Sequence, residues 1–259
     1  MSIDTQTVSE VEPNVVERKF TVSEIYGDVV QGEGTMTYVR THFLRMGGCD
    51  YQHCSWCDSL YAVLPEEVRK LERLSAKEIV TRILSLPRAP YVTISGGNPV
   101  MHKLDDVVDA LHAANYCVAV ETQGTLWKDW VGQCECITCS PKPPSSGMTT
   151  NWSLLDNFIA KSRLANTQLC LKVVVFTDDD YEYARTVYHR YRCDDGSTPF
   201  YLQTGTILPT TENPNGDTVY TLTQRYRELT ERVLADGDMQ YARPSCQQHV
   251  LMYGHKRGI

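Results

Sequence analysis

The chain has 259 residues, with 25 Lys and Arg against 32 Asp and Glu, which gives a formal net charge of -7. This length allows one large domain with a core of its own. The acidic balance argues against binding along a nucleic-acid backbone, because phosphate contacts need a basic face. No apolar run approaches the roughly 18 residues of a membrane-spanning helix, and the polar N-terminus lacks the apolar core of a secretory signal. We therefore expect a cytoplasmic protein that contacts neither membrane nor nucleic acid.

In chain order, residues 1–20 predict a flexible N-terminal arm and residues 21–259 a single domain in which strands and helices alternate. Ser75 starts one helix with a capping box, since Glu78 follows three residues later. Such alternation implies parallel strands with right-handed crossovers, an α/β fold of the TIM-type barrel kind, partial or modified. The predicted strands are 41–46, 91–95, 116–122, 134–140, 169–176, 199–203 and 239–243, and the predicted helices are 75–86, 102–115, 152–162, 178–191 and 219–235.

Three of the ten cysteines, Cys49, Cys54 and Cys57, follow directly after the first of these strands. Without an export signal, clustered thiols indicate metal or redox chemistry. Three thiolates suit a [4Fe–4S] cluster that keeps one iron free for an outside ligand. Zinc with His53 as the fourth ligand is the alternative, and it would form a closed structural site. The spacing alone does not decide between the two metals.

A pair of glycines, Gly96 and Gly97, follows the strand at 91–95. Glycines let a ligand approach the backbone, whose amides can hold a carboxylate or an amino group. Taken alone, the run Ser-Gly-Gly-Asn-Pro is as typical of an ordinary turn. Its position matters, because the turns at the carboxyl ends of parallel strands carry the active site in α/β barrels.

Together, the three-cysteine loop and the Gly-Gly strand end resemble the radical S-adenosylmethionine superfamily. The resemblance narrows to the 7-carboxy-7-deazaguanine synthase family, because further segments follow in family order along the domain. These segments are 24–34, 44–62, 92–99, 120–125, 140–146, 171–176, 200–203, 247–249 and 255–259.

The resemblance implies a radical lyase that converts 6-carboxy-5,6,7,8-tetrahydropterin to 7-carboxy-7-deazaguanine and ammonia by ring contraction, on the route to queuosine. It implies three cofactors, a [4Fe–4S] cluster, S-adenosylmethionine and Mg²⁺. It also implies a reductant such as flavodoxin or ferredoxin, and a homodimer. The radical chemistry belongs to the cofactors, so the protein has to bind and orient the reactants.

The resemblance also assigns site residues position by position. Cys49, Cys54 and Cys57 would hold the cluster, and the Ser59 hydroxyl would bind Mg²⁺, a hard ion that prefers oxygen. The remaining assignments are Trp56, Asp58, Gly97, Ser140, Pro141, Lys142 and Gln203 for S-adenosylmethionine, and Val30, Gln31, Gly32, Arg45, Ser95 and Ile259 for the pterin.

The chemistry of two assigned residues agrees with these roles. Arg45 offers a planar fork for a carboxylate, and the Gln31 amide matches the donors and acceptors of a pterin edge. Outside the family context, ordinary interpretations remain open: Arg45 in a surface ion pair, Gln31 as a solvated loop residue and Ser59 as a helix cap.

No catalytic residue is identified beyond two candidates, Glu121 and His249. Glu121 and Gln123 lie at the end of the strand at 116–122, and the His249 imidazole could move protons during the loss of ammonia. Lys172 stands in an apolar strand, so its charge must pair with an acid such as Glu121 or lie at a strand end.

Two features depart from the family pattern. Four residues rather than three separate Cys49 from Cys54, which leaves His53 either as an inserted loop residue or as a zinc ligand. Cys134, Cys136 and Cys139 form an additional run that could hold an auxiliary cluster. On a flat strand, however, Cys134 and Cys136 would share one face and Cys139 the other, which favours ordinary buried thiols.

Two other functions compete with the synthase. One is an activating enzyme for a glycyl-radical protein, which needs a groove for a protein loop. The other is a zinc-stabilised binding or regulatory module, which would be colourless and would not cleave S-adenosylmethionine. The segments 31–34, 121–125 and 140–144 indicate a small enclosed substrate and favour the synthase.

Overall fold

A computed structural model describes residues 17–51, 53–165, 167–210 and 216–258. Its strands form one sheet in the order β3-β1-β2-β4-β5-β6-β7-β8-β9. The strands are β1 (Lys19–Val30), β2 (Arg40–Met46), β3 (Glu72–Ser75), β4 (Tyr91–Gly96), β5 (Cys117–Thr122), β6 (Cys136–Cys139), β7 (Gln168–Val175), β8 (Phe200–Thr204) and β9 (Ala242–Ser245).

From β2 to β9 all neighbouring strands run parallel, and the sheet is open because β3 and β9 stand at its two edges. The predicted α/β partial barrel is therefore confirmed. The helices are α1 (Leu60–Val63), α2 (Pro65–Val68), α3 (Ala76–Leu84), α4 (Asp105–Ala113), α5 (Trp152–Leu164), α6 (Asp178–Arg190), α7 (Val219–Ala235) and α8 (Gln248–Tyr253). None of those in the described part of the chain has the length and hydrophobicity of a membrane-spanning helix.

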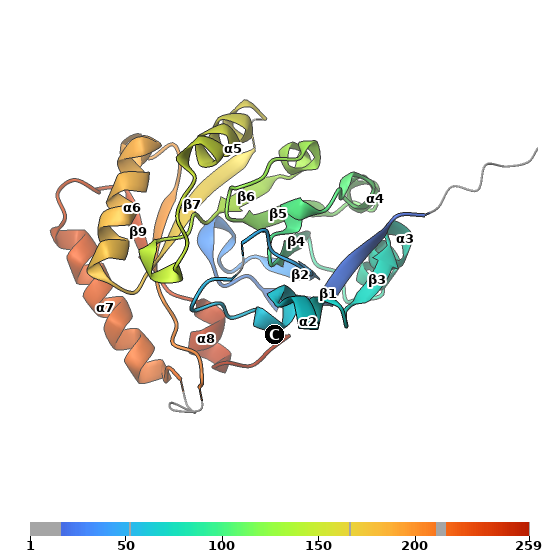
Figure 1. Cartoon of the computed structure of the whole chain (residues 1–259), viewed down its shortest axis with the longest axis horizontal. Coiled ribbons are helices and arrows are strands. Elements are labelled where there is room, and N and C mark those ends of the chain that lie inside the picture. Colours follow the sequence, from blue (N-terminus) through green and yellow to red (C-terminus); the bar gives the residue numbers. More distant parts are fainter. Residues whose placement is uncertain (1–16, 52, 166, 211–215, 259) are drawn as a thin grey trace, which may run out of the picture.

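Helices α3 to α7 cover the outer face of the curved sheet, whereas α8 lies on the other side (Figure 1). The main core fills the space between the sheet and these outer helices. Ile83 of α3, Leu111 of α4 and Leu44 of β2 are fully buried there. Since one face of β2 to β8 packs against helices, the opposite face is left for a pocket.

Two antiparallel strands were not expected from the alternating pattern. β1 pairs antiparallel with both β2 and β3, and these three strands form one edge of the sheet. The arm was predicted to end at residue 20, but β1 already begins at Lys19. Lys19 and the buried Phe20 both pair with β3. The rest of that arm, residues 1–16, lies outside the described residues.

Local signals predicted several helix starts. The capping box at Ser75 and Glu78 is present, and α7 begins and ends where the apolar spacing predicted. The cap of α6 differs, because Thr177 rather than Asp178 accepts the bond from the Asp180 amide. Asp178 instead stands in the first turn, where its negative charge favours the helix N-terminus.

Candidate active site

A cavity of about 290 Å³ lies at the carboxyl ends of the parallel strands. It brings together residues from β1, β2, the cysteine loop and the ends of β4 to β8. The predicted residues that line it are Val30, Gln31, Gly32, Arg45, Cys49, Cys54, Trp56, Cys57, Asp58, Ser59, Gly97, Ser95, Glu121, Ser140, Lys142, Gln203 and His249. Pro141 lines a small neighbouring hollow instead, and Ile259 lies outside the described residues.

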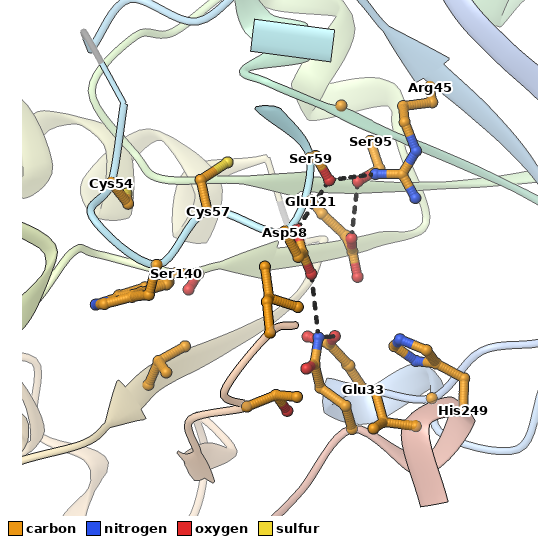
Figure 2. A pocket seen from close by; sticks show the side chains of 18 of the residues that line it. Glu33, Arg45, Cys54, Cys57, Asp58, Ser59, Ser95, Glu121, Ser140 and His249 are labelled. Atoms are coloured by element: carbon orange, nitrogen blue, oxygen red, sulfur yellow. Dashed lines mark hydrogen bonds between the residues drawn. The ribbon is translucent and has the colours of Figure 1, made fainter. Parts of the chain in front are cut away.

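The three-cysteine loop forms one wall of this cavity. Cys49, Cys54 and Cys57 are half-buried and not in disulfides. Figure 2 shows Cys54 and Cys57 side by side on this loop. Burial raises the pKa of each thiol, that of Cys57 to about 11, while the nearby Lys142 acts in the opposite direction. Metal binding would reverse this effect, because thiolates are stabilised as ligands.

These thiols fit a [4Fe–4S] cluster in kind and number. Each thiolate of such a cluster binds a different iron, so its ligands need not converge on one point. Within the described residues, no three His, Cys, Asp or Glu side chains gather closely enough to hold a single metal ion.

Asp50 fixes the cysteine loop to the ends of β4 and β5. Its carboxylate accepts hydrogen bonds from Asn98 Nδ2 at 2.8 Å, from Gln123 Nε2 at 2.6 Å and from Thr125 Oγ1 at 2.5 Å. The Cys49 thiol in turn donates to Gln123 Oε1 at 3.7 Å. The first predicted cluster ligand is thus held by the next two strands of the sheet.

At Gly97, directly after β4, the backbone packs closely against the start of the cysteine loop. A Cβ atom at this position would stand 2.1 Å from the Gly48 carbonyl oxygen and 3.1 Å from Cys49 Cβ. Any side chain would therefore push the loop away from the strand. The Gly-Gly pair is required here by close backbone packing, which also keeps this edge of the cavity open.

An aromatic and basic wall stands on the β6–β7 side. Trp56 packs against Phe176 with ring centres 5.5 Å apart, and Lys142 Nζ lies 5.8 Å from the Trp56 ring centre. The Trp56 indole donates to Ser145 Oγ at 2.9 Å, and Lys142 donates to Ser140 Oγ at 3.4 Å. This wall offers a flat apolar surface next to a cation.

Glu121 lies at the floor of the cavity with both carboxylate oxygens engaged. Oε1 accepts a hydrogen bond from Gln31 Nε2 and Oε2 accepts one from Ser95 Oγ, each at 2.9 Å. The three side chains come from β5, the end of β1 and β4, so the sheet topology assembles them. Their fixed orientation provides a row of donors and acceptors for a polar ring.

Arg45 points into the cavity from β2. Its Nε donates to Glu24 at 3.2 Å, Nη1 to Ser59 Oγ at 3.1 Å and Nη2 to Tyr26 at 3.2 Å. Burial opposes its charge, yet the tyrosines and Asp58 raise the pKa of Arg45 above its usual value. It is a partly buried cation held by hydrogen bonds to three residues, the geometry expected of an anion-binding side chain.

A chain of polar contacts crosses the cavity from Arg45. Ser59 donates to Asp58 at 2.8 Å, and Gln247 Nε2 donates both to Asp58 at 3.3 Å and to Glu33 at 2.8 Å. Figure 2 shows Ser59 between Arg45 and Asp58, with Glu33 and His249 on the opposite side. The assigned Mg²⁺ ligand is thus bonded to a guanidinium and to a carboxylate.

Lys172 pairs with Glu33 rather than with Glu121. Both side chains line the cavity and are nearly buried. The prediction of an acidic partner is correct, but the partner comes from the loop after β1, far away in the sequence. The family segments at 24–34 and 247–249 contained Glu33 and Gln247 without indicating their contacts.

The run of Cys134, Cys136 and Cys139 differs from the geometry predicted for it. Cys134 precedes β6, and it shares the main core with Cys139, while Cys136 packs on the other face with Met36 and Ala119. The prediction that Cys134 and Cys136 share a face is wrong, because Cys134 is not part of the strand. All three thiols are buried, and they point into two different clusters.

No protein-family model matches the chain, but individual known proteins do. The chain is 38% identical to the 7-carboxy-7-deazaguanine synthase of Bacillus subtilis strain 168 over 244 residues, which cover 92% of this chain and 98% of that protein. A protein of the same name from Bacillus cereus is 36% identical over 244 residues, covering 93% and 99%.

The chain belongs to the 7-carboxy-7-deazaguanine synthase family. Its fold is shared with the crystal structure of QueE from Escherichia coli, which matches with a TM-score of 0.60 at 22% identity over 84% of this chain and 90% of that chain. Membership makes it a radical S-adenosylmethionine enzyme, a class that uses a [4Fe–4S] cluster. The activating enzyme and the zinc-stabilised module are therefore set aside.

Proposed function

We propose that this chain converts 6-carboxy-5,6,7,8-tetrahydropterin to 7-carboxy-7-deazaguanine and ammonia, a step of 7-deazapurine synthesis. One observation carries the proposal beyond family membership. A three-thiol loop and a fixed polar group, Arg45 with Glu121, Gln31 and Ser95, line the same cavity. Such a cavity can hold a radical-generating cofactor beside a small, carboxylated, nitrogen-rich ring.

The cofactor end of the cavity is formed by the cysteine loop and by the aromatic and basic wall on the β6–β7 side. Cys49, Cys54 and Cys57 would hold the cluster, and the edge at Gly97 would receive the methionyl group. Trp56, Asp58, Ser140, Pro141, Lys142 and Gln203 would surround the rest of S-adenosylmethionine. Once bound, the two cofactors supply the one-electron chemistry that removes a substrate hydrogen.

The substrate end is the polar floor. Arg45 would bind the pterin carboxylate through its planar fork, since a charge-assisted bidentate pair gives both orientation and affinity. Glu121, held by Gln31 and Ser95, would accept N–H groups of the pterin edge, and Val30, Gly32 and Ile259 would complete the contact. His249 is placed to exchange protons as the amine leaves.

Ser59 is proposed to bind Mg²⁺ together with substrate oxygens. Its hydroxyl and the Asp58 carboxylate are hard oxygen donors, which is the chemistry that Mg²⁺ prefers. Arg45 donates to the same hydroxyl, so the guanidinium and the metal ion compete for it. Binding of the substrate carboxylate would give Arg45 an alternative partner.

Four further assignments remain predictions. The cluster would receive electrons from flavodoxin or ferredoxin, and the cysteine loop has an exposed residue, His53. The chain would work as a homodimer in the cytoplasm. Residues from Lys19 onward would act as one catalytic domain, because the strands share one sheet.

The test is anaerobic turnover of the reconstituted protein. Dithionite, S-adenosylmethionine, Mg²⁺ and the pterin are supplied, and products are identified by mass. The proposal expects 7-carboxy-7-deazaguanine from the wild type and none from Cys54→Ala. Cleavage of S-adenosylmethionine with the pterin untouched would leave the superfamily assignment and refute the substrate.

A further inference from the structure

The segment after α8, residues 254–258, lies along the cavity and is here called the C-terminal strap. Gly254 ends α8 with a φ of +65°, a value that an L side chain rarely adopts, and so redirects the chain. His255 Nε2 then donates a hydrogen bond to the Asp217 carbonyl oxygen, 3.1 Å away. Figure 1 shows this red segment running from α8 towards α2.

Arg257 attaches the strap to the opposite side of the cavity. Its guanidinium lies 3.4 Å from the ring centre of Tyr61 in α1, and its Nη2 donates to Glu24 Oε1 of β1 at 2.5 Å. Burial opposes the charge, but the bond to Glu24 raises the pKa of Arg257. A stacked guanidinium with a carboxylate partner is a well-defined contact rather than a loose surface pair.

Glu24 accepts hydrogen bonds from two arginines, Arg257 and Arg45. Its Oε1 accepts from Arg257, while its Oε2 accepts from Arg45 Nε at 3.2 Å and from the Tyr61 hydroxyl at 3.1 Å. Arg257 and Tyr61 therefore both contact the carboxylate to which Arg45 also donates.

We propose that Arg257 is a positioning residue for substrate recognition: it fixes Glu24, and through Glu24 it aims Arg45 at the substrate carboxylate. This inference rests on the proposed function, in which Arg45 binds that carboxylate. The contact is not required for folding, since the Arg257 side chain is 57% exposed and exposed ion pairs contribute little to stability. Its effect is on the binding of an anionic ring compound.

Binding can be measured without turnover. The cluster-loaded protein with S-adenosylmethionine but no reductant is titrated with 6-carboxypterin, an oxidised analogue, by calorimetry. Arg257→Gln is expected to weaken binding about tenfold, a change equivalent to about 1.4 kcal/mol. In turnover, the KM for the pterin should rise by a similar factor while kcat changes less than about threefold, as for loss of a uniform binding contact.

Two variants serve as references. Arg227→Gln removes the same charge from the exposed face of α7, where Arg227 contacts Gln224 and Glu231, and should bind the analogue like the wild type. Arg257→Lys keeps the charge but not the planar stack on Tyr61, and should recover only part of the lost affinity. Equal binding by Arg257→Gln and wild type would overturn the inference.

A double-mutant cycle tests the route through Glu24. In a Glu24→Gln background, Arg257→Gln should weaken binding by less than about twofold, because the connection is already broken. Full additivity would mean that Arg257 touches the ligand itself and would overturn the positioning role. If Glu24→Gln does not fold, Glu24→Asp replaces it, since the side chain, shorter by one methylene, draws the carboxylate away from both arginines.

The outcome also separates the two proposals. A wild type that leaves the pterin unchanged refutes the proposed function. A wild type that converts the pterin, with an Arg257→Gln variant of unchanged KM and analogue affinity, refutes the positioning role alone.

Discussion

Glu33 and Lys172 form an ion pair that is almost wholly inside the protein and joins the loop after β1 to β7. Burial opposes both charges, yet each stabilises the other. The pair with Lys172 lowers the pKa of Glu33 to about 2, and Glu33 raises the pKa of Lys172. Gln247 also donates to Glu33, so the pair connects β7 to α8 at the cavity wall.

Breaking this pair should destabilise the protein strongly. Glu33→Gln removes the carboxylate that is paired with the buried Lys172 charge, at a cost of about 3–5 kcal/mol. Urea unfolding at pH 7 measures this loss. The double variant Glu33→Gln with Lys172→Met should recover most of it, and a Glu33→Gln protein as stable as the wild type would contradict the account.

The pair also predicts an acid-side loss of stability. Because the folded pKa of Glu33 is below its ordinary value of 4.5, its stabilising contribution is present above that pH and is lost as the pH falls towards about 2. Unfolding free energies measured between these limits should fall more steeply for the wild type than for Glu33→Gln. Parallel curves for the two proteins would exclude this role.

Mg²⁺ dependence should follow the hydroxyl at position 59. Ser59→Ala removes the assigned oxygen ligand, so we expect an about tenfold higher Mg²⁺ requirement in turnover, equivalent to about 1.4 kcal/mol. Ser59→Thr keeps a hydroxyl and should respond to Mg²⁺ like the wild type. A Mg²⁺ titration of the three proteins checks this, and identical curves would place the ion elsewhere.

Iron content should separate the two cysteine groups. The reconstituted wild type should hold about four irons per chain, as one [4Fe–4S] cluster requires. Cys57→Ala should lose most of this iron and the brown colour, whereas Cys136→Ala, on the opposite face from Cys134 and Cys139, should retain both. Iron well above four per chain, lost in Cys136→Ala, would indicate an auxiliary cluster.

Gly97→Ala tests the close approach of the cysteine loop. The added Cβ would meet the Gly48 carbonyl oxygen at 2.1 Å, so the loop must shift, and overpacking of this kind costs about 1–3 kcal/mol. We expect weaker S-adenosylmethionine binding by calorimetry and a lower Tm. Gly237→Ala, whose Cβ meets nothing within 4 Å, is the matched control. Wild-type affinity in Gly97→Ala would refute the assignment of this edge.

The regular part of the fold could be predicted because its signals are local. The capping box at Ser75 and the apolar spacing of residues 219–235 depend only on neighbouring residues, and both elements formed as predicted. β1 lacked such a signal. Beyond Val22 its residues are mostly half-buried and its register with β2 is interrupted, so the period of two that identifies a strand is lost.

The sequence indicated many of the residues that line the cavity, but not their contacts. Charge burial predicted that Lys172 pairs with an acid or lies at a strand end, yet only the fold brings Glu33 to it across 139 positions. Glu24 likewise joins Arg45 and Arg257 from three distant segments. Pairings of this kind depend on tertiary structure, and one sequence carries no local signal for them.

The most direct test is to compare the amounts of the two products of ring contraction with the amount of pterin consumed. 7-Carboxy-7-deazaguanine and ammonia together carry all the atoms of 6-carboxy-5,6,7,8-tetrahydropterin. Quantifying ammonia and the deazaguanine in the same anaerobic reaction should give equal amounts, matching the pterin consumed, with neither formed by Cys54→Ala. Pterin consumption without ammonia, or ammonia without the deazaguanine, would contradict the central claim.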